Sequence, residues 1–351
     1  MRRKRTRGRP ARWLSALVLM AMLLPGISGI ALAEAMTFTN AGKALSYVKA
    51  NQPMELTLES VKFTPTELLK IKNAMPEGAT LHFSTAWGKA QFTDETEDLD
   101  LTVRGNVTAA DLEALIALCP NLKRIDNSNH RTPSNKEMIP LIEKYPDIQF
   151  EWVVRIGYQY YCSTMDTAFS TFQEPNTTTR LSSEQLENLK YLPRLKALDV
   201  GHNRIKTLDF LQYVPDLEML IIGDNFVQDL TPISNLKHLQ YAELFSNHYT
   251  DISPLAECTE LLDLNICHND VTDLSPLDNI TSLERLWATM IYVLPEEEKA
   301  RFQELHPNTL TDFSSTHPTG NGWRKHERNK HYIWCLRHKT WIPFGEPLPN
   351  S

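Results

Sequence analysis

The heptapeptide Leu264–Asp270, with the sequence LNICHND, brings together residue types that can do chemistry. Cys267 and His268 are neighbours, which suits either a nucleophile with its base or a pair of metal ligands. A catalytic pair needs its two side chains to converge, whereas adjacent residues of a strand point to opposite faces. The spacing therefore favours a structural role, and we predict no catalytic residue here.

A second set of such residues lies near the C-terminus, where His331, Cys335 and His338 have spacings that could meet a metal ion on a helix or hairpin. His326 could complete a set of four. No second cysteine is near and histidines are common in basic segments, so we expect no metal ion and no other cofactor. The sequence also lacks the zinc-protease, serine-hydrolase, phosphate-loop and C-x-x-C motifs. We therefore do not expect an enzyme.

The N-terminus combines basic residues with an apolar stretch, Leu14–Ala33, that ends in small residues with A-x-A spacing. This pattern is typical of a secretory signal peptide, to which we assign residues 1–35. The mature chain is then expected to be secreted or on the cell surface, without a membrane segment after cleavage. An uncleaved N-terminal anchor is the alternative, because the apolar stretch is nearly long enough to span a bilayer. A proline and two glycines inside the stretch favour cleavage.

The chain of 351 residues is acidic, with a formal net charge of −7. Cleavage would bring the charge to about −14, because seven Lys and Arg residues precede Ala33. Such a chain is not suited to binding nucleic acid, since nothing offsets phosphate repulsion. Its five cysteines are too sparse for a disulfide scaffold, although one bridge is possible. The hydrophobic core must therefore hold the fold.

The middle of the chain repeats with a period of 22 residues. Five copies align in three apolar columns: Leu195, Leu217, Leu239, Leu261, Leu283; then Leu198, Leu220, Ala242, Leu264, Leu286; then Val200, Ile222, Leu244, Ile266, Ala288. Four copies continue with an asparagine: Asn203, Asn225, Asn247 and Asn269. This is the L-x-x-L-x-L-x-x-N-x-L pattern of leucine-rich repeats.

Each copy predicts a short strand with two alternate apolar side chains inside a coil, followed by a turn at the asparagine. The asparagine amide can bond backbone groups that the turn leaves unpaired. Stacked coils pair these strands in parallel. In the second half of three copies a proline favours an extended or 3₁₀ return rather than a full helix. Leu264 and Ile266 are then core residues, Asn269 belongs to the asparagine ladder, and Cys267 and His268 occupy variable positions.

The repeats resemble the 22-residue leucine-rich repeats of internalins, which are bacterial surface proteins. The D-[LI]-[TS]-P runs at Asp229–Pro232, Asp251–Pro254 and Asp273–Pro276 carry this resemblance. It covers roughly Leu181 to Met290, about a third of the chain. The resemblance implies a curved solenoid and a binding role outside the cell, with no catalytic residues. The fifth copy has Ile291 in place of the asparagine, as expected where an array ends.

Looser copies precede the array, each with a Ser or Thr helix start, a short amphipathic helix, a proline and a short apolar strand. The prolines are Pro76, Pro120, Pro146 and Pro193. We therefore predict an α/β leucine-rich-repeat solenoid with a parallel sheet on its concave face and irregular helix-containing repeats at its N-terminal side. Its parts are residues 36–180 (irregular repeats), 181–294 (regular repeats), 295–313 (cap) and 314–351 (tail). A separate α/β domain is the alternative for the first part, and residues 157–180 are interpreted as a loop-rich insertion.

Variable strand positions on the concave side have no core partner in their own coil, yet several are aromatic or charged. They are Tyr241, Glu243, Phe245, Asp263, Asn265, Arg285 and Trp287. Aromatic side chains beside carboxylates on a solvated face are typical of a binding patch. We hypothesise that this patch recognises a protein partner. The alternative explanation is that the insertion or the tail covers the face.

The tail differs from the acidic body, because it combines six Lys and Arg residues with Trp323, Trp334 and Trp341. The simplest interpretation is a tail that folds over the acidic solenoid. A second functional hypothesis is attachment to a cell-wall polymer or glycan through this basic, Trp-rich segment. The tail also resembles those of other secreted leucine-rich proteins of Clostridia-like bacteria.

Overall fold

The computed structural model describes residues 37–171 and 180–349. Residues 35–351 form one compact unit. The predicted signal peptide lies outside the described residues, so its assignment stays a prediction. Within the described ranges, no helix is both long enough and apolar enough to cross a bilayer.

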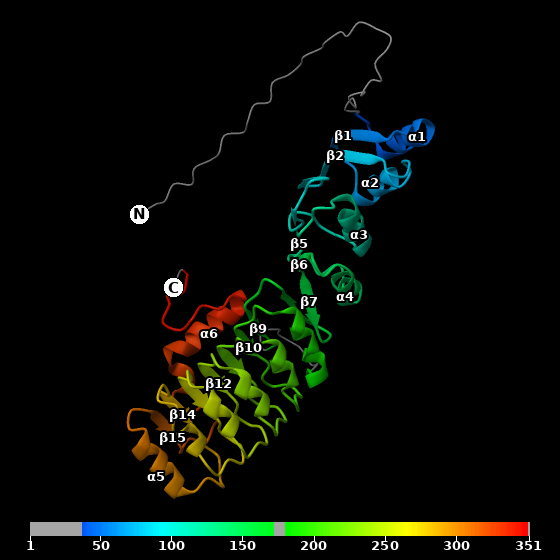
Figure 1. The fold of residues 1–351 in the computed structure, drawn as a ribbon. Coiled ribbons are helices and arrows are strands. Elements are labelled where there is room, and N and C mark those ends of the chain that lie inside the picture. The colour runs from blue at the N-terminus through cyan, green and yellow to red at the C-terminus, as the bar shows by residue number, and fades with distance from the viewer. Residues whose placement is uncertain (1–36, 172–179, 350–351) are drawn as a thin grey trace, which may run out of the picture. The chain divides into compact units, whose positions relative to one another are not determined.

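The N-terminal region alternates helices with strands that form three small sheets (Figure 1). Its first elements are α1 (Ala41–Asn51), β1 (Glu55–Val61), α2 (Pro65–Lys72), β2 (Thr80–Trp87) and β3 (Ala90–Thr93). They are followed by β4 (Asp98–Asp100), α3 (Ala109–Leu118), β5 (Arg124–Asp126), α4 (Asn135–Lys144) and β6 (Gln149–Glu151). The hairpin β7 (Val153–Ile156) and β8 (Tyr160–Ser163) separates β6 from the next sheet. One buried apolar cluster nevertheless runs through all these coils into the regular array.

The predicted helix starts are confirmed as reciprocal caps at Thr64, Thr108 and Ser134. At Thr64, for example, the Glu67 amide donates to Thr64 Oγ1 (3.2 Å) while the Thr64 amide donates to Glu67 Oε2 (2.8 Å). Each pair satisfies two backbone donors that a helix start would otherwise leave unpaired. The fourth start, at Ser182, opens a 3₁₀ helix, η1 (Ser183–Tyr191), in place of the expected α-helix.

The regular repeats form a seven-stranded parallel sheet in the order β15-β14-β13-β12-β11-β10-β9. Its strands are β9 (Ala168–Ser170), β10 (Ala197–Asp199), β11 (Met219–Ile221), β12 (Tyr241–Glu243), β13 (Asp263–Asn265), β14 (Arg285–Trp287) and β15 (Leu310–Asp312). The three returns with a proline are 3₁₀ turns, as predicted: η3 (Thr231–Asn235), η4 (Ser253–Glu257) and η5 (Ser275–Leu277). The first copy, which lacks this proline, has a 3₁₀ turn as well, η2 (Asp209–Tyr213). Strand pairing keeps residues 22 positions apart side by side, as the columns predict.

The asparagine ladder bonds neighbouring coils as well as its own turn. Asn225 Oδ1 accepts from the Ile205 amide (3.0 Å), while its Nδ2 donates to the carbonyls of Val200 (3.1 Å) and Ile222 (3.0 Å). The residue before each asparagine adopts a left-handed conformation that the sequence pattern did not reveal. These residues are His202, Asp224, Ser246 and His268, with φ between 52° and 58°.

The interpretation of residues 157–180 as a loop-rich insertion is wrong for residues 160–170. Tyr160 and Cys162 alternate as buried side chains of the β7–β8 hairpin, and Ala168 begins the first strand of the large sheet. Residues 172–179 lie outside the described ranges. The β4 strand ends at Asp100, because the Asp100 carboxylate accepts from the Thr102 amide (2.8 Å) and turns the chain.

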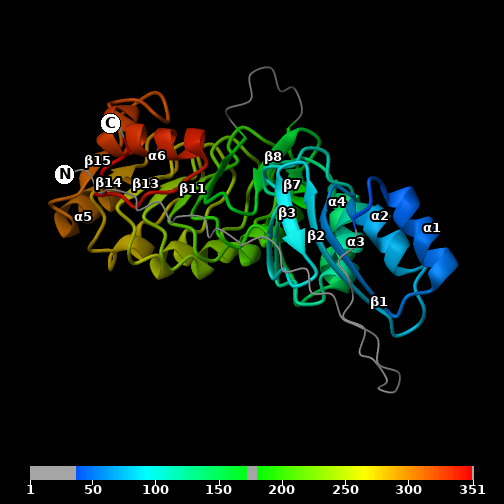
Figure 2. The same cartoon turned by 90° about the horizontal axis from the view of Figure 1, so that it is seen from above.

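The C-terminal part consists of α5 (Glu296–Leu305), which caps the array before β15, and the tail elements η6 (Trp323–Lys325) and α6 (Glu327–His338). The residues assigned to the cap, 295–313, contain α5 and β15. Figure 2 shows that α6 lies along the large sheet, on the side away from the 3₁₀ returns. We call this side of the seven-stranded sheet the concave face.

Candidate functional site

The tail covers the C-terminal half of the concave face. Such cover was the alternative explanation for the aromatic and charged residues on this face. All seven residues of the predicted binding patch are at most 6% exposed: Tyr241, Glu243, Phe245, Asp263, Asn265, Arg285 and Trp287. Three of them, Tyr241, Phe245 and Trp287, belong with apolar tail residues to a second hydrophobic cluster, separate from the core of the coils. Most of the predicted patch therefore contacts the chain itself.

Glu243 is the centre of this contact and is fully buried. Its carboxylate accepts hydrogen bonds from Tyr241 Oη (2.5 Å), Trp323 Nε1 (3.0 Å), Arg324 Nη2 (2.6 Å) and Tyr332 Oη (3.2 Å). Three of these four donors belong to the tail. A buried carboxylate with this many donors is stabilised only while the donors stay in place. The Glu243 carboxylate and the docked tail therefore stabilise each other.

Asp263 makes a second charged contact one coil further along the sheet. It accepts from Arg285 Nε (2.8 Å) and Nη2 (2.7 Å) in a bidentate pair. The tail adds Arg328, whose Nη1 donates to Asp263 Oδ1 (2.8 Å) and whose Nη2 pairs with Glu284. The basic character of the tail is thus matched by carboxylates of the acidic repeats.

Trp323 fills the space above these charges and is fully buried. Its ring centroid lies 5.2 Å from that of Trp287 and 5.7 Å from that of Tyr241. The Arg285 guanidinium lies 4.4 Å from the Trp323 ring centroid, within cation–π range. The segment before η6 also bonds to the sheet through its backbone, because the Gly320 carbonyl accepts a hydrogen bond from Trp287 Nε1 (3.1 Å).

The segment that directly follows α6 contacts the other end of the sheet. The Thr167 amide, just before β9, donates to the Lys339 carbonyl (3.0 Å), and the Trp341 amide donates to Thr167 Oγ1 (2.6 Å). Trp341 Nε1 donates to Glu218 Oε2 (2.6 Å). The tail therefore contacts the concave face at both ends.

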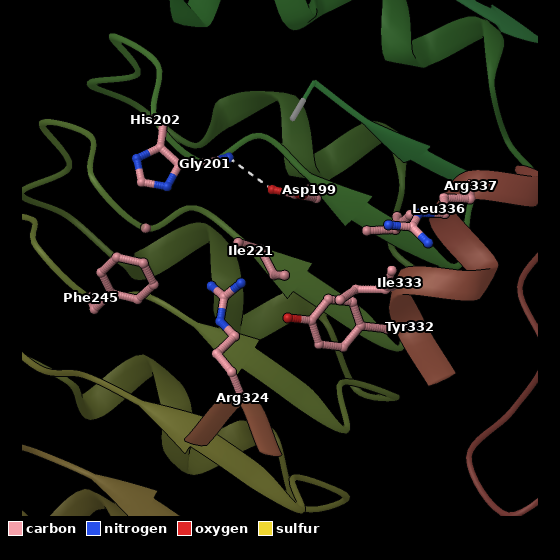
Figure 3. Close-up of a pocket in the computed structure, with 11 residues that line it drawn as sticks. Asp199, Gly201, His202, Ile221, Phe245, Arg324, Tyr332, Ile333, Leu336 and Arg337 are labelled. Carbon is pink, nitrogen blue, oxygen red and sulfur yellow. Dashed lines mark hydrogen bonds between the residues drawn. The ribbon is translucent and has the colours of Figure 1, made fainter. Parts of the chain in front are cut away.

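Between these contacts the concave face stays open as a cavity of about 280 Å³ (Figure 3). It lies between β10–β12 and α6, and its walls are Asp199, Gly201, His202, Ile221, Gly223, Phe245, Arg324, Tyr332, Ile333, Leu336 and Arg337. Gly223 matters to its shape, because a Cβ there would lie 2.5 Å from the Phe245 ring. Phe245 thus packs across a position that only glycine leaves free. Figure 3 shows Arg324 extending between Phe245 and Tyr332.

Asp199 is the acidic group of the cavity and is 7% exposed. Its carboxylate accepts from Ser170 Oγ (2.8 Å) and from the Gly201 amide (3.1 Å). Burial raises the pKa of Asp199 above its ordinary value, while these hydrogen bonds act in the opposite direction. Both oxygens already have donors, so this carboxylate is a structural part of the wall.

Neither cysteine–histidine set converges. Cys267 Sγ is buried and accepts from Thr289 Oγ1 (3.3 Å), whereas the exposed His268 ring lies 3.0 Å from Ser246 Oγ. In the tail, His331 Nε2 lies 2.7 Å from the Ile342 carbonyl. Across residues 37–171 and 180–349, no group of three or more His, Cys, Asp or Glu side chains could hold a metal ion.

All five cysteines lie within the described ranges as free, buried thiols. Burial raises the pKa of the Cys119 and Cys258 thiols to about 12 and that of Cys267 to about 11. A high pKa leaves little thiolate at neutral pH, so these thiols are poor nucleophiles. The disulfide that the sequence allowed does not form among them.

Of the predicted patch, Phe245 alone lines the cavity. The other six residues hold the tail or lie beneath it. Asp199, Gly201 and Gly223 were not predicted as site residues, although glycines in two adjacent copies of one column were a usable signal for open space. Arg324 and Arg337 were not predicted either, since no repeat pattern shows where a tail docks.

No protein-family model matches this chain, and no curated protein does. Among solved structures it is similar to an internalin C2 of Listeria monocytogenes, at 26% identity over 44% of this chain and 76% of that one, with a TM-score of 0.32. An internalin F of the same species matches at 18% identity over 76% of this chain and 70% of that one, with a TM-score of 0.37. A leucine-rich-repeat protein of Leptospira interrogans matches at 20% identity over 74% and 72%, with a TM-score of 0.38.

These superpositions are partial, so the assignment of the fold depends on the chain's own repeats, sheet register and asparagine ladder. On those grounds the described chain has a leucine-rich-repeat fold, with its own tail on the concave face.

Proposed function

We propose that this protein is a non-enzymatic binding protein, extracellular or at the cell surface, that recognises a protein partner through the open part of its concave face. The observation that carries the proposal is the cavity between β10–β12 and α6. The export signature at residues 1–35 supports the location.

The shape and composition of the cavity suit a side chain of a partner protein. Its volume of about 280 Å³ lies just below the usual range of small-molecule sites, too small for a large cofactor and large enough for one bulky side chain. Its floor is apolar and nearly inaccessible, with Ile221 at 5% and Phe245 at 6% exposure. Exposed polar groups such as His202 surround it. A buried apolar pocket with a polar rim is the usual setting of an interface hot spot.

The remaining residues of the predicted patch then act indirectly. Glu243 and Asp263 hold η6 and α6 in place, and α6 forms one wall of the cavity. The tail is thus part of the binding site. Direct contact with the partner is proposed for Phe245, Ile221 and the exposed rim.

Attachment to a glycan through the tail tryptophans finds no support in a specific contact. Trp323 and Trp341 are at most 8% exposed. Trp334 is partly exposed, and its ring stacks on His338 with centroids 4.0 Å apart. A glycan platform needs exposed aromatic faces, so this alternative is kept only as an arm of the experiment.

The test is site-specific photo-crosslinking of the full chain. A photoreactive residue replaces His202 at the rim of the cavity or, as a control, Lys237 on a return, where the two native side chains are 51% and 54% exposed. Each protein is offered extracellular proteins and, separately, cell-wall polysaccharide. We expect a protein to be crosslinked from position 202 and not from position 237. This crosslink should disappear when Ile333→Trp fills the cavity. Equal crosslinking from both positions, or capture of polysaccharide alone, would contradict it.

A further inference from the structure

Resting on the proposed function, we infer that the cavity selects an acidic segment of the partner, in which a large apolar side chain enters the cavity beside a carboxylate. The apolar side chain would lie on Ile221, Phe245 and Leu336. The carboxylate would bind the guanidinium group of Arg337, and Arg324 would favour the same negative charge from the other end of the cavity wall.

Arg337 is the first reason for this charge preference. It lies in the last turn of α6, lines the cavity and is exposed. In the described part of the chain, no acceptor lies within hydrogen-bonding or ion-pairing distance of its guanidinium. Arg328 on the same helix is already paired with Asp263 and Glu284. An unpaired guanidinium beside an apolar cavity offers a planar pair of donors that fits a carboxylate.

Arg324 adds further donors from the opposite end of the cavity wall. Its Nη2 donates to Glu243 Oε2 (2.6 Å), which fixes the position of the group. Its side chain is still 41% exposed, so its other nitrogen atoms can bind a ligand at the cavity. A guanidinium held by a buried carboxylate is preorganised, which lowers the entropy cost of binding.

The acidic groups near the cavity do not offset this preference. Asp199 has donors on both oxygens and is nearly inaccessible. The Asp224 carboxylate is paired with His202, because its Oδ2 lies 2.8 Å from His202 Nδ1. The charged side chains of the cavity wall that can still bind a ligand are therefore the cationic ones, Arg324 and Arg337. This local charge is opposite to that of the chain as a whole, which carries a net charge of −7. A local basic site on an acidic protein selects partners by charge complementarity.

The test is selection of random heptapeptides on the immobilised full chain. We expect enrichment of Phe, Trp or Leu with Asp or Glu beside it. The affinity of a selected peptide, measured by fluorescence anisotropy, should fall about tenfold or more in Arg337→Glu, because a charge-assisted pair becomes a repulsive one. Lys330→Glu is the matched control, since it makes the same charge change at an exposed position of α6 that does not line the cavity. It should change the affinity less than about twofold.

Ile333→Trp separates this inference from the proposed function. The charge preference would be overturned, and the cavity left as the site, by either of two results with peptides that need an open cavity. In the first, the peptides show no enrichment of acidic residues. In the second, they bind Arg337→Glu with the same affinity as Lys330→Glu. If no peptide is enriched, or the selected peptides bind Ile333→Trp unchanged, both the inference and the proposed function are overturned.

Discussion

The two halves of the concave face share one sheet and one register but differ in what lies on them. Strands β12–β14 place Glu243, Asp263 and Arg285 under the tail, and the tail supplies partners for each. Strands β10 and β11 are followed, two residues after their ends, by Gly201 and Gly223, and a cavity remains there. Backbone geometry is the same in both halves, so the side chains at the variable positions decide where the tail docks and where space is left.

The difference has an energetic consequence. Buried charges lose their hydration, so the closed half is favourable only when every charge has its partners. The open half has one nearly inaccessible carboxylate, Asp199, with neutral donors. Removing a buried carboxylate should therefore lower the free energy of unfolding more in the closed half than in the open half.

The largest effect is expected from Glu243→Ala. The substitution leaves the Arg324 charge and three other donors without their acceptor, which should lower the free energy of unfolding by about 3–5 kcal/mol. Urea denaturation followed by tryptophan fluorescence measures it. Asp199→Asn is the control in the open half and should cost about 1 kcal/mol or less, because it removes no charged partner. Equal losses in both variants would remove the energetic distinction between the halves.

An intermediate effect is expected from Gly223→Ala in the open half. The new Cβ would lie 2.5 Å from the Phe245 ring, so the ring must move and the cavity changes shape. We expect a loss of about 1–3 kcal/mol, as for other overpacked sites, together with weaker peptide binding. Gly201→Ala is the comparison, since its Cβ would meet the Gly223 carbonyl oxygen at 3.2 Å and leave Phe245 in place. If both variants bind peptide as the wild type does, Phe245 is not part of the site.

The smallest effect concerns pH. Because burial raises the pKa of Asp199, the folded state binds its proton more tightly than the unfolded state does, for which the ordinary value is 3.8. The contribution of this group to stability is fully present below that value and is lost as pH rises through the raised pKa. The free energy of unfolding of the wild type minus that of Asp199→Asn should therefore fall as pH rises above about 4. A difference that rises with pH over this range would show a lowered pKa instead.

Sequence reasoning predicted the repeats well because their determinants are local and periodic. Leu264, Ile266 and Asn269 recur at fixed spacing, and each spacing maps to one position of a coil. The β9 strand was missed because Ala168–Ser170 lacks the leucine pattern and pairs with β10 only through the folded sheet.

The candidate site was less accessible to sequence reasoning, since it depends on contacts between distant segments. Arg324 and Glu243 are 81 residues apart, and the charge contrast of tail and body predicted their association without specifying the pair. The same aromatic residues indicated a surface patch, and the structure shows that they are buried under the tail. Composition alone does not distinguish a face that binds a partner from one that binds its own chain.

Alkylation of native thiols by iodoacetamide, followed by mass spectrometry, measures whether the tail covers the concave face. Cys267 lies on the concave face and Cys335 on α6, and both belong to the cluster that the tail completes. Cys258 lies in the core of the coils and serves as the internal reference. With the tail docked, we expect all three thiols to stay unmodified until the protein unfolds. Modification of Cys267 and Cys335 in the native protein, while Cys258 stays protected, would show that the tail does not cover the concave face.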